Sequence, residues 1–419
     1  MPKVMQFTKG SIIFFSGDRD ERIFILQSGC VILSSIKLST GDTVAEQVHV
    51  GEFFGVKSAL AHMPRYETAQ VFTDTQVVAL TVQEFEKIFS SKQDVTWKML
   101  RVFSKSLREL HKQTEIVIQK DDVHEISPDE GMFNVARGFY DSDEFHSCVD
   151  VLQKILLLYP DTPLKTEIAR LLPDAKSNAS RTASKMEVDT SNAALGTGAL
   201  SQFSLPMFDR FSKSYKSGDV IITEYEPGET FYLVQTGQVQ VVKCINNSIK
   251  NIDILKPGEF FGEMAILDNS PRGATCLAKG NVTCLEFNKA NFKTVVTGNP
   301  QIVMMLLKLF CKRIYDQQRK LKNLTIKDLS VRVADVFLLF DEKSGMSSEL
   351  SKSVQKRKFN LNVNGVAQWA GISLEQARDE LNRYVERHKI DIYDNYIVVG
   401  NIMDMKRTVD SYFSAHLNR

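Results

Sequence analysis

A glycine-rich phrase with one acid and one arginine is the part of this sequence best suited to hold an anion. The phrase is GEFFGEMAILDNSPRGAT, Gly258–Thr275. Gly262 and Gly273 let the backbone come close to a ligand and turn N–H groups towards it. Glu263 begins a short helical turn whose positive end favours negative charge, and Arg272 offers a fork of donors that matches phosphate oxygens. This combination predicts a site for a small sugar phosphate.

The same phrase occurs a second time, nearer the amino terminus. The earlier copy is GEFFGVKSALAHMPRYET, Gly51–Thr68, and it agrees with the later copy at nine of eighteen positions. It keeps Pro64 and Arg65 but has Val56 in place of the glutamate, and Glu67 adds a negative charge. Valine cannot accept a hydroxyl proton, and an unpaired buried hydroxyl costs ~1–3 kcal/mol. We therefore expect the first copy not to bind the ligand, or to bind it at least about tenfold more weakly.

The two phrases belong to a longer repeat that predicts the supporting fold. In each copy, two glycines nineteen residues apart (Gly10–Gly29 and Gly218–Gly237) enclose short β-branched and aromatic segments. Such segments, joined by glycine turns, are typical of an antiparallel barrel or jelly roll. The sequence therefore predicts a duplicated β-fold over residues 1–120 and 208–325.

Each copy ends in a predicted helix with an apolar stripe. The stripe of the second helix is interrupted once, at Gln317. The two stripes can pair with each other in an intramolecular pseudo-dimer, can each pair with a twin in a homodimer, or can pack on their own β-domains. The sequence leaves these alternatives open. The stripe residues are Leu100, Phe103, Leu107, Leu110, Thr114 and Val117 in the first helix, and Val303, Leu307, Phe310, Ile314, Leu321 and Leu324 in the second.

Two unlike segments separate the copies. Phe133–Pro163 predicts a helical hairpin that resembles one tetratricopeptide-type unit in its small and aromatic positions and its closing proline. Asp174–Gln202 is rich in Ser, Ala, Thr and Asn and has almost no large apolar residue, so it cannot bury a core. We expect a helical hairpin over 126–173 and a flexible linker over 174–203.

The phrase at Gly258–Thr275 resembles the phosphate-binding cassette of cyclic-nucleotide-binding domains, as in protein kinase A regulatory subunits and catabolite activator (Crp/Fnr-like) regulators. The resemblance covers roughly Phe211–Leu324. It implies that Glu263 binds the ribose 2′-hydroxyl and that Arg272 pairs with the cyclic phosphate. The resemblance also implies that the backbone amides of Gly262, Met264 and Ala274 line the phosphate. Gly273 stands where the regulators have a serine, so the resemblance implies one hydroxyl contact fewer at this position.

The resemblance further places base-reading groups in the helix that follows. Gln317 and Gln318 lie where those groups would be expected, and a carboxamide can both donate to and accept from an adenine edge. The alternative for Gln317 is a polar residue that sets the register of the helix seam. The cassette does not read the base, so cyclic AMP is favoured only by the resemblance, with cyclic GMP as the alternative.

The carboxyl-terminal segment Phe359–Asn401 resembles the winged helix-turn-helix of catabolite-activator-type transcription factors. The resemblance implies that the second of two helices, which begins at the capping residue Ser373, enters the major groove of DNA. Leu374 and Asp379 stand where the family has arginines, so an acidic face weakens the DNA contact, and charge would have to come from Lys352 and Lys356–Lys358. The candidate DNA-contacting residues are Ser373, Glu375, Gln376, Arg378 and Arg383.

Composition bounds the remaining function classes. The 419 residues are 43% hydrophobic and 25% charged, with a net charge of +1, which does not suggest a general polyanion binder. The six cysteines form no CxxC pair, the histidines form no metal-ligand spacing, and no apolar run reaches the ~18 residues of a membrane span. With no secretory leader or catalytic motif, we expect a cytoplasmic protein, not an enzyme, without metal or resident cofactor.

The sequence thus predicts an α+β multidomain protein. It has a degenerate cyclic-nucleotide-binding-like domain (1–125), a helical insert (126–173), a linker (174–203), a cyclic-nucleotide-binding domain (204–325) and a winged helix-turn-helix (326–419). The predicted function is that of a cyclic-nucleotide-responsive, Crp/Fnr-like transcriptional regulator. The alternative is a signalling adaptor in which the first barrel or the helical hairpin binds a protein rather than DNA.

Overall fold

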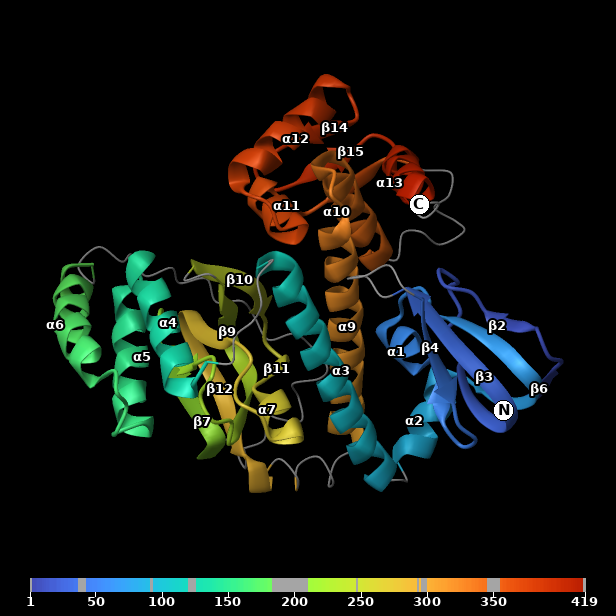
Figure 1. Ribbon diagram of the computed structural model, residues 1–419, viewed down its shortest axis with the longest axis horizontal. Coiled ribbons are helices and arrows are strands. Elements are labelled where there is room, and N and C mark those ends of the chain that lie inside the picture. Colours follow the sequence, from blue (N-terminus) through green and yellow to red (C-terminus); the bar gives the residue numbers. More distant parts are fainter. Residues whose placement is uncertain are drawn as a thin grey trace. The chain divides into compact units, whose positions relative to one another are not determined.

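The computed structural model of the protein is drawn in Figure 1. The chain forms two compact units: one comprises Met1–Met99, Glu109–Lys120 and Met304–Arg419, and the other Leu100–Arg108 and Asp121–Val303. The structure describes residues 2–36, 43–90, 93–119, 126–182, 210–245, 248–291, 294, 300–344 and 355–416.

The amino-terminal sheet is antiparallel and has the strand order β1-β6-β3-β4, with β2 against β6 and β5 against β3. Alternating side chains of these strands point inward, and Phe14, Phe24 and Phe54 stack in the core with Leu26 and Val77. Its elements are β1 (Lys3–Phe7), β2 (Ile12–Phe14), β3 (Ile23–Ile36), β4 (Thr43–Val48), β5 (Phe53–Phe54), α1 (Val56–Ala61) and β6 (Thr68–Leu80).

The second sheet repeats this topology, with the order β10-β9-β12-β7, β11 against β9 and β8 against β12. Its core includes Ile222, Val234 and Cys284. The predicted duplication of an antiparallel β-fold is confirmed. A closed barrel is not, because among the described residues the edge strands β7 and β10 do not pair with each other. The elements are β7 (Ser212–Tyr215), β8 (Val220–Ile222), β9 (Thr230–Ile245), β10 (Ser248–Leu255), β11 (Phe260–Phe261), α7 (Glu263–Asp268) and β12 (Thr275–Asn288).

Helices follow each sheet, as expected. They are α2 (Val82–Ser90) with α3 (Gln93–Gln119) after the first, and α9 (Pro300–Thr325) after the second. Within one unit the polar interruptions of the two apolar stripes meet, since the Gln317 Nε2 donates to the Thr114 Oγ1 at 2.7 Å. This contact supports the intramolecular pairing of the two helices among the three alternatives.

Three helices, rather than two, make up the insert: α4 (Pro128–Asp141), α5 (Phe145–Leu158) and α6 (Lys165–Thr182). Helix α6 corrects the predicted linker, because it continues through residues 174–182 before the described part of the chain ends. Ala175 explains the difference: it is fully buried in the insert core with Ile168, so the small residues of this stretch still pack. Residues 183–203, the rest of the predicted linker, lie outside the described residues.

The insert packs against the second sheet, and Figure 1 draws α4, α5 and α6 in green beside it. Phe139 and Leu152 of the insert share one core with Val242 and Leu277 of the sheet. Gly131 of α4 allows this close approach, because a Cβ there would lie 2.5 Å from the Tyr225 ring. The insert and the second sheet are therefore one packed body.

The carboxyl-terminal elements surround a three-stranded antiparallel sheet of order β13-β15-β14. Phe337, Phe359, Leu381 and Ile397 lie in its core. No helix in the described ranges is long and apolar enough to cross a membrane. The elements are α10 (Leu329–Lys343), β13 (Arg357–Phe359), α11 (Val363–Ala370), α12 (Leu374–Glu386), β14 (Ile390–Ile392), β15 (Ile397–Val399) and α13 (Ile402–His416).

Candidate functional site

The cassette of the second sheet is built around Gly262. This residue follows β11, begins α7 and has a φ of 80°, a left-handed conformation that favours glycine. A Cβ at this position would lie 2.9 Å from the Arg272 Nη1 and 3.2 Å from the Thr230 carbonyl oxygen. The glycine is needed because the arginine side chain crosses directly over the backbone.

Arg272 is held on both sides of its guanidinium and at its backbone. Its Nη1 donates to the Gly262 carbonyl at 2.6 Å and its Nη2 to the Thr230 Oγ1 at 3.0 Å. Its backbone N–H donates to the Glu226 carbonyl, and its own carbonyl accepts from the Tyr225 N–H, both at 2.9 Å. The side chain is 2% exposed. A cation held this rigidly in a poorly hydrated place is suited to neutralise an anion.

Glu263 and Arg272 meet at the same glycine. Glu263 follows Gly262 in the chain, is the first residue of α7 and is 1% exposed, while Arg272 donates to the Gly262 carbonyl. The structure thus places both predicted residues at Gly262, the acid next to it in the chain and the guanidinium on its carbonyl. Met264 and Ala274 are half-buried in α7 and in the loop before β12, and Gly273 is exposed.

The two predicted base-reading residues lie in α9. The Gln317 amide donates to Thr114, as expected of a polar residue that sets the register of two paired helices. Gln318 is half-buried on the same helix. A contact from either side chain to a base stays a prediction.

Sequence reasoning missed Glu226, a buried acid beside the arginine. Its Oε1 lies 3.8 Å from the Arg272 Nε, and its Oε2 accepts from the Lys154 Nζ at 3.1 Å. The repeat contained a signal for it, because Asp18 holds the corresponding place in the first copy, where its carbonyl accepts from the Arg65 N–H at 2.8 Å. The repeat gave no such signal for Lys154, because this residue belongs to the helical insert, which lies outside the repeat.

Arg108 is a second missed residue. Its Nε donates to the Asp268 Oδ2 at 2.7 Å, its Nη2 to the Asp268 Oδ1 at 3.1 Å, and its Nη1 to the Pro271 carbonyl at 3.2 Å. Asp268 ends α7, and its side chain is 3% exposed. A residue from α3, the helix that follows the first sheet, thus covers the cassette of the second. Sequence alone could not place it there, because the contact spans 160 residues.

The first cassette has the same backbone but uses its arginine differently. Gly55 has a φ of 74°, and the Arg65 Nη1 donates to its carbonyl at 2.5 Å and to the Ser58 Oγ at 3.0 Å. The Arg65 Nη2 donates to the Arg22 carbonyl, and the guanidinium lies 4.4 Å from the centre of the Phe14 ring. Burial lowers the pKa of Arg65 to about 10, against the opposing effect of a nearby aspartate. The guanidinium of Arg65 is therefore already hydrogen-bonded to groups of its own domain.

The first cassette also lacks the acid that the second copy has after its left-handed glycine. Val56 is buried where the second copy has Glu263. Burial raises the pKa of Glu67, with Lys57 acting in the opposite direction. No carboxylate therefore follows Gly55 to accept from a ligand hydroxyl.

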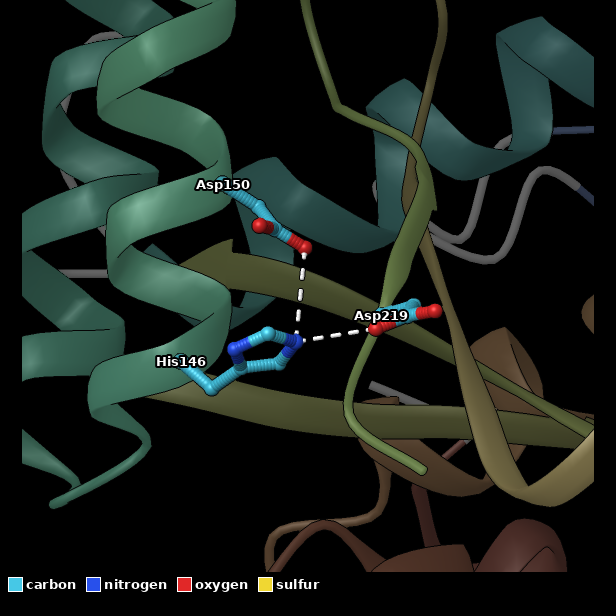
Figure 2. Close-up of side chains that lie close together, drawn as sticks. All are labelled: His146, Asp150 and Asp219. Carbon is cyan, nitrogen blue, oxygen red and sulfur yellow. Dashed lines mark hydrogen bonds and ion pairs between the residues drawn. The ribbon is translucent and has the colours of Figure 1, made fainter. Parts of the chain in front are cut away.

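A cluster of one histidine and two aspartates joins the insert to the second sheet (Figure 2). The His146 Nε2 lies 2.8 Å from the Asp219 Oδ1 and 3.9 Å from the Asp150 Oδ2. Their ligand atoms all lie within 4.8 Å of one another, a spacing that could hold a metal ion and that the sequence analysis did not foresee. Because the His146 imidazole already lies at hydrogen-bond distance from Asp219, we interpret the cluster as a polar contact that joins α5 to the turn before β8.

The five candidate DNA-contacting residues all belong to α12 or its cap. Ser373 and Gln376 form a capping box: the Ser373 Oγ accepts from the Gln376 N–H at 3.1 Å, and the Gln376 Oε1 accepts from the Ser373 N–H at 3.0 Å. The Arg383 Nη1 donates to the Glu380 Oε1 at 2.6 Å. Glu375 and Arg378 are exposed. Two of the five thus have a structural role in starting the helix. Lys352, named as a source of positive charge, lies outside the described residues.

The family model of the cyclic nucleotide-binding domain matches residues 4–92 and 212–299. The chain carries two cyclic nucleotide-binding domains. These are the two sheets with their cassettes, so the resemblance stated from the sequence is confirmed for both copies.

Curated relatives match parts of the chain. A cAMP-dependent protein kinase regulatory subunit of Blastocladiella emersonii is 38% identical over 82 residues, which are 19% of this chain and 20% of the relative. A CRP-like cAMP-activated global transcriptional regulator of Mycobacterium tuberculosis is 22% identical over 188 residues, 45% of this chain and 83% of the relative. The chain thus spans about a fifth of the length of the kinase regulatory subunits that it matches.

Solved structures are similar over part of the chain. A CooA variant from Carboxydothermus hydrogenoformans has a TM-score of 0.42 and 17% identity, and covers 52% of this chain and 98% of its own. The regulatory domain of Toxoplasma gondii PKA with cAMP has a TM-score of 0.21 and 15% identity, and covers 72% of this chain and 84% of its own.

Proposed function

We propose that the second cyclic nucleotide-binding domain binds cyclic AMP through Arg272 and Glu263. The observation that carries the proposal is a buried guanidinium bonded to the Gly262 carbonyl, with the buried Glu263 as the next residue in the chain. The guanidinium neutralises the single charge of a cyclic phosphate, and the carboxylate accepts from a ribose hydroxyl. We propose cyclic AMP rather than cyclic GMP as the ligand because the matched relatives are named for cAMP.

In this proposal, the first domain has the same fold as the second but does not bind the ligand. Arg65 donates to the carbonyls of Gly55 and Arg22 and to Ser58, so a ligand phosphate would have to displace contacts already made. With Val56 in place of the acid, the ribose hydroxyl would also lose its acceptor. Its role is regulatory or structural.

The carboxyl-terminal elements form a winged helix-turn-helix in this proposal, and cyclic AMP controls its action on DNA. The order α10, β13, α11, α12, β14, β15 fits this fold, as does the left-handed Gly371 between α11 and α12, with a φ of 62°. The exposed Arg378 on α12 is the candidate for a base contact. The whole protein is then a ligand-responsive transcriptional regulator rather than an enzyme.

A second candidate function follows from the charge of α12. Its exposed side chains include Glu375, Asp379 and Glu386 besides the arginines, a face that DNA phosphates would repel. In this case the protein is a cyclic-nucleotide-sensing adaptor whose carboxyl-terminal module binds a protein.

Calorimetry of the whole protein against cyclic AMP and cyclic GMP tests the ligand. Glu263→Gln keeps the shape and removes the charge, so it should raise the Kd roughly 10- to 100-fold, as expected for a hydrogen bond to a charged group. Glu229→Gln is the matched control, because Glu229 is exposed on the loop before β9. Absence of binding at millimolar nucleotide, or equal affinity in the Glu263 variant, would contradict the proposal.

Gel-shift titration of genomic DNA fragments separates the two functions. Retention that changes with cyclic AMP, falls with rising salt and weakens in Arg378→Ala supports the regulator. Absence of retention at low salt, with or without ligand, supports the adaptor.

A further inference from the structure

Lys154 of helix α5 reaches from the insert into the second cyclic nucleotide-binding domain. Its Nζ donates to the Ile221 carbonyl at 3.2 Å, to the Thr223 Oγ1 at 3.4 Å and to the Glu226 Oε2 at 3.1 Å. These partners lie in β8 and in the loop that follows it. The lysine therefore ends beside the acid that faces Arg272.

Glu226 is shared between two cations. It lies 3.1 Å from the Lys154 Nζ but 3.8 Å from the Arg272 Nε, beyond ordinary hydrogen-bond length. The carboxylate is thus bound more closely by the lysine than by the arginine. All three side chains are largely buried, at 26%, 11% and 2% exposed for Lys154, Glu226 and Arg272, so their charges act on one another more strongly than they would in water.

We propose that Lys154 is a positioning residue that keeps Arg272 available for the ligand, and that the helical insert thereby sets the affinity of the nucleotide site. With the lysine present, the three linked side chains carry one net positive charge, which the single negative charge of a cyclic nucleotide balances. Without it, Arg272 is the remaining cation beside Glu226 in the described part of the chain, and the carboxylate competes with the phosphate for the guanidinium. Glu263 adds a further negative charge next to Gly262. Loss of the positive charge of Lys154 therefore weakens binding of the anionic nucleotide further.

The insert is held firmly enough to position this lysine. The Ser147 Oγ donates to the Gly218 carbonyl at 2.9 Å, and His146 pairs with Asp219 at 2.8 Å, both at the start of α5 (Figure 2). Gly131 of α4 packs on the Tyr225 ring, and the Tyr225 N–H donates to the Arg272 carbonyl. A partner or a modification that shifts the insert would therefore change the ligand affinity, and by linkage the ligand would change the stability of the insert docking.

A double-mutant cycle on the full-length protein tests this inference, which rests on the proposed binding of cyclic AMP. The Kd for cyclic AMP is measured by calorimetry for wild type, Lys154→Met, Glu226→Gln and the double variant. Lys154→Met should raise the Kd about fivefold or more, Glu226→Gln should bind no more weakly than wild type, and Lys154→Met should have no further effect when Glu226 is glutamine. Lys154→Arg should restore most of the affinity. Lys165→Met is the matched control, because Lys165 is an exposed insert lysine whose ion pair is with the exposed Asp161.

The outcomes separate the inference from the proposed function. Wild-type protein that does not bind cyclic AMP overturns the proposed function, and the inference with it. Wild-type protein that binds, with Lys154→Met equal to it or with the same loss in the Glu226→Gln background, overturns the inference alone. Hydrogen exchange gives a reciprocal readout: cyclic AMP should slow exchange in α5 of wild type and do so less in Lys154→Met. Equal slowing in both proteins counts against the coupling.

Discussion

At the scale of single residues, Arg65 and Arg272 show how one side chain can serve two purposes on the same backbone. Each donates to the carbonyl of a left-handed glycine, Gly55 or Gly262. The Arg65 Nη2 donates to a second backbone carbonyl, that of Arg22. The Arg272 Nη2 donates instead to the Thr230 Oγ1, a hydroxyl that can rotate to a new partner. The two arginines thus differ in their neighbours, and this difference is the basis for proposing Arg272 rather than Arg65 as the ligand-binding arginine.

Gly262→Ala should weaken both the fold and the ligand site. A left-handed φ costs a non-glycine residue ~1–2 kcal/mol, and the new Cβ would displace Arg272. Gly273→Ala is the control, since its nearest contact would be 3.6 Å away and its φ is not positive. We expect the control to change the free energy of unfolding by less than about 0.5 kcal/mol. Thermal unfolding compares both variants and calorimetry measures ligand binding by Gly262→Ala. Equal effects of the two changes on the free energy of unfolding would refute the assigned role of Gly262.

Val56→Glu should not create a second binding site. The new acid would stand where Glu263 stands in the second copy, but Arg65 would remain bonded to Ser58 and to backbone carbonyls beneath the Phe14 ring. Calorimetric titration should therefore give one cyclic nucleotide per chain for both wild type and variant. A second saturable site in wild type would show that the first domain still binds ligand.

At the scale of the elements, the sequence predicted what depends on local chemistry. The glycines, the acid and the arginine of the cassette were placed by their spacing, and the helix cap at Ser373 by its residue type. Lys154 and Arg108 could not be predicted, because their positions depend on how separate elements pack. The helical continuation to Thr182 was missed because Ser, Ala and Asn gave no apolar signal, although Ala175 still found a buried place.

The docking of α5 should depend on pH through Asp150. Burial raises the pKa of Asp150 above its ordinary value of 3.8, while the Val220 N–H, His146 and Lys154 act against this rise and Asp219 adds to it. The folded state therefore binds the proton more tightly than the unfolded state. The stabilising contribution is present at low pH and is lost as the pH rises from about 4 through the folded pKa.

Asp150→Asn removes this titration. The stability of α5 in the variant, relative to wild type, should therefore grow as the pH rises from about 4 to about 7. Hydrogen exchange of the α5 amides at several pH values measures it. A difference between the two proteins that does not change with pH would show that Asp150 does not titrate differently on folding.

At the scale of the whole molecule, two helices each belong to both compact units. Helix α3 gives Leu100–Arg108 to one unit and Gln93–Met99 with Glu109–Gln119 to the other, and α9 is divided at Met304. Each helix is thus a continuous covalent link between the units. A change at the nucleotide site that alters either helix can be passed on without a separate contact surface.

The protein should be a monomer in solution. Thr114 and Gln317 pair within one chain, which satisfies the polar positions that would otherwise meet a twin helix in a homodimer. Light scattering after size exclusion should therefore give about the chain mass of 47.4 kDa, with and without cyclic AMP. A stable mass of twice this value would favour the homodimer instead.

The contact of Arg108 with Asp268 has a practical consequence for dissecting the protein. A fragment that starts after the insert would retain every residue proposed to bind the nucleotide, yet it would uncover the Asp268 carboxylate, which is now 3% exposed, and would release the Pro271 carbonyl. Its cassette loop would then be freer than in the intact chain. Ligand constants measured on such a fragment would describe a looser cassette than that of the 419-residue chain.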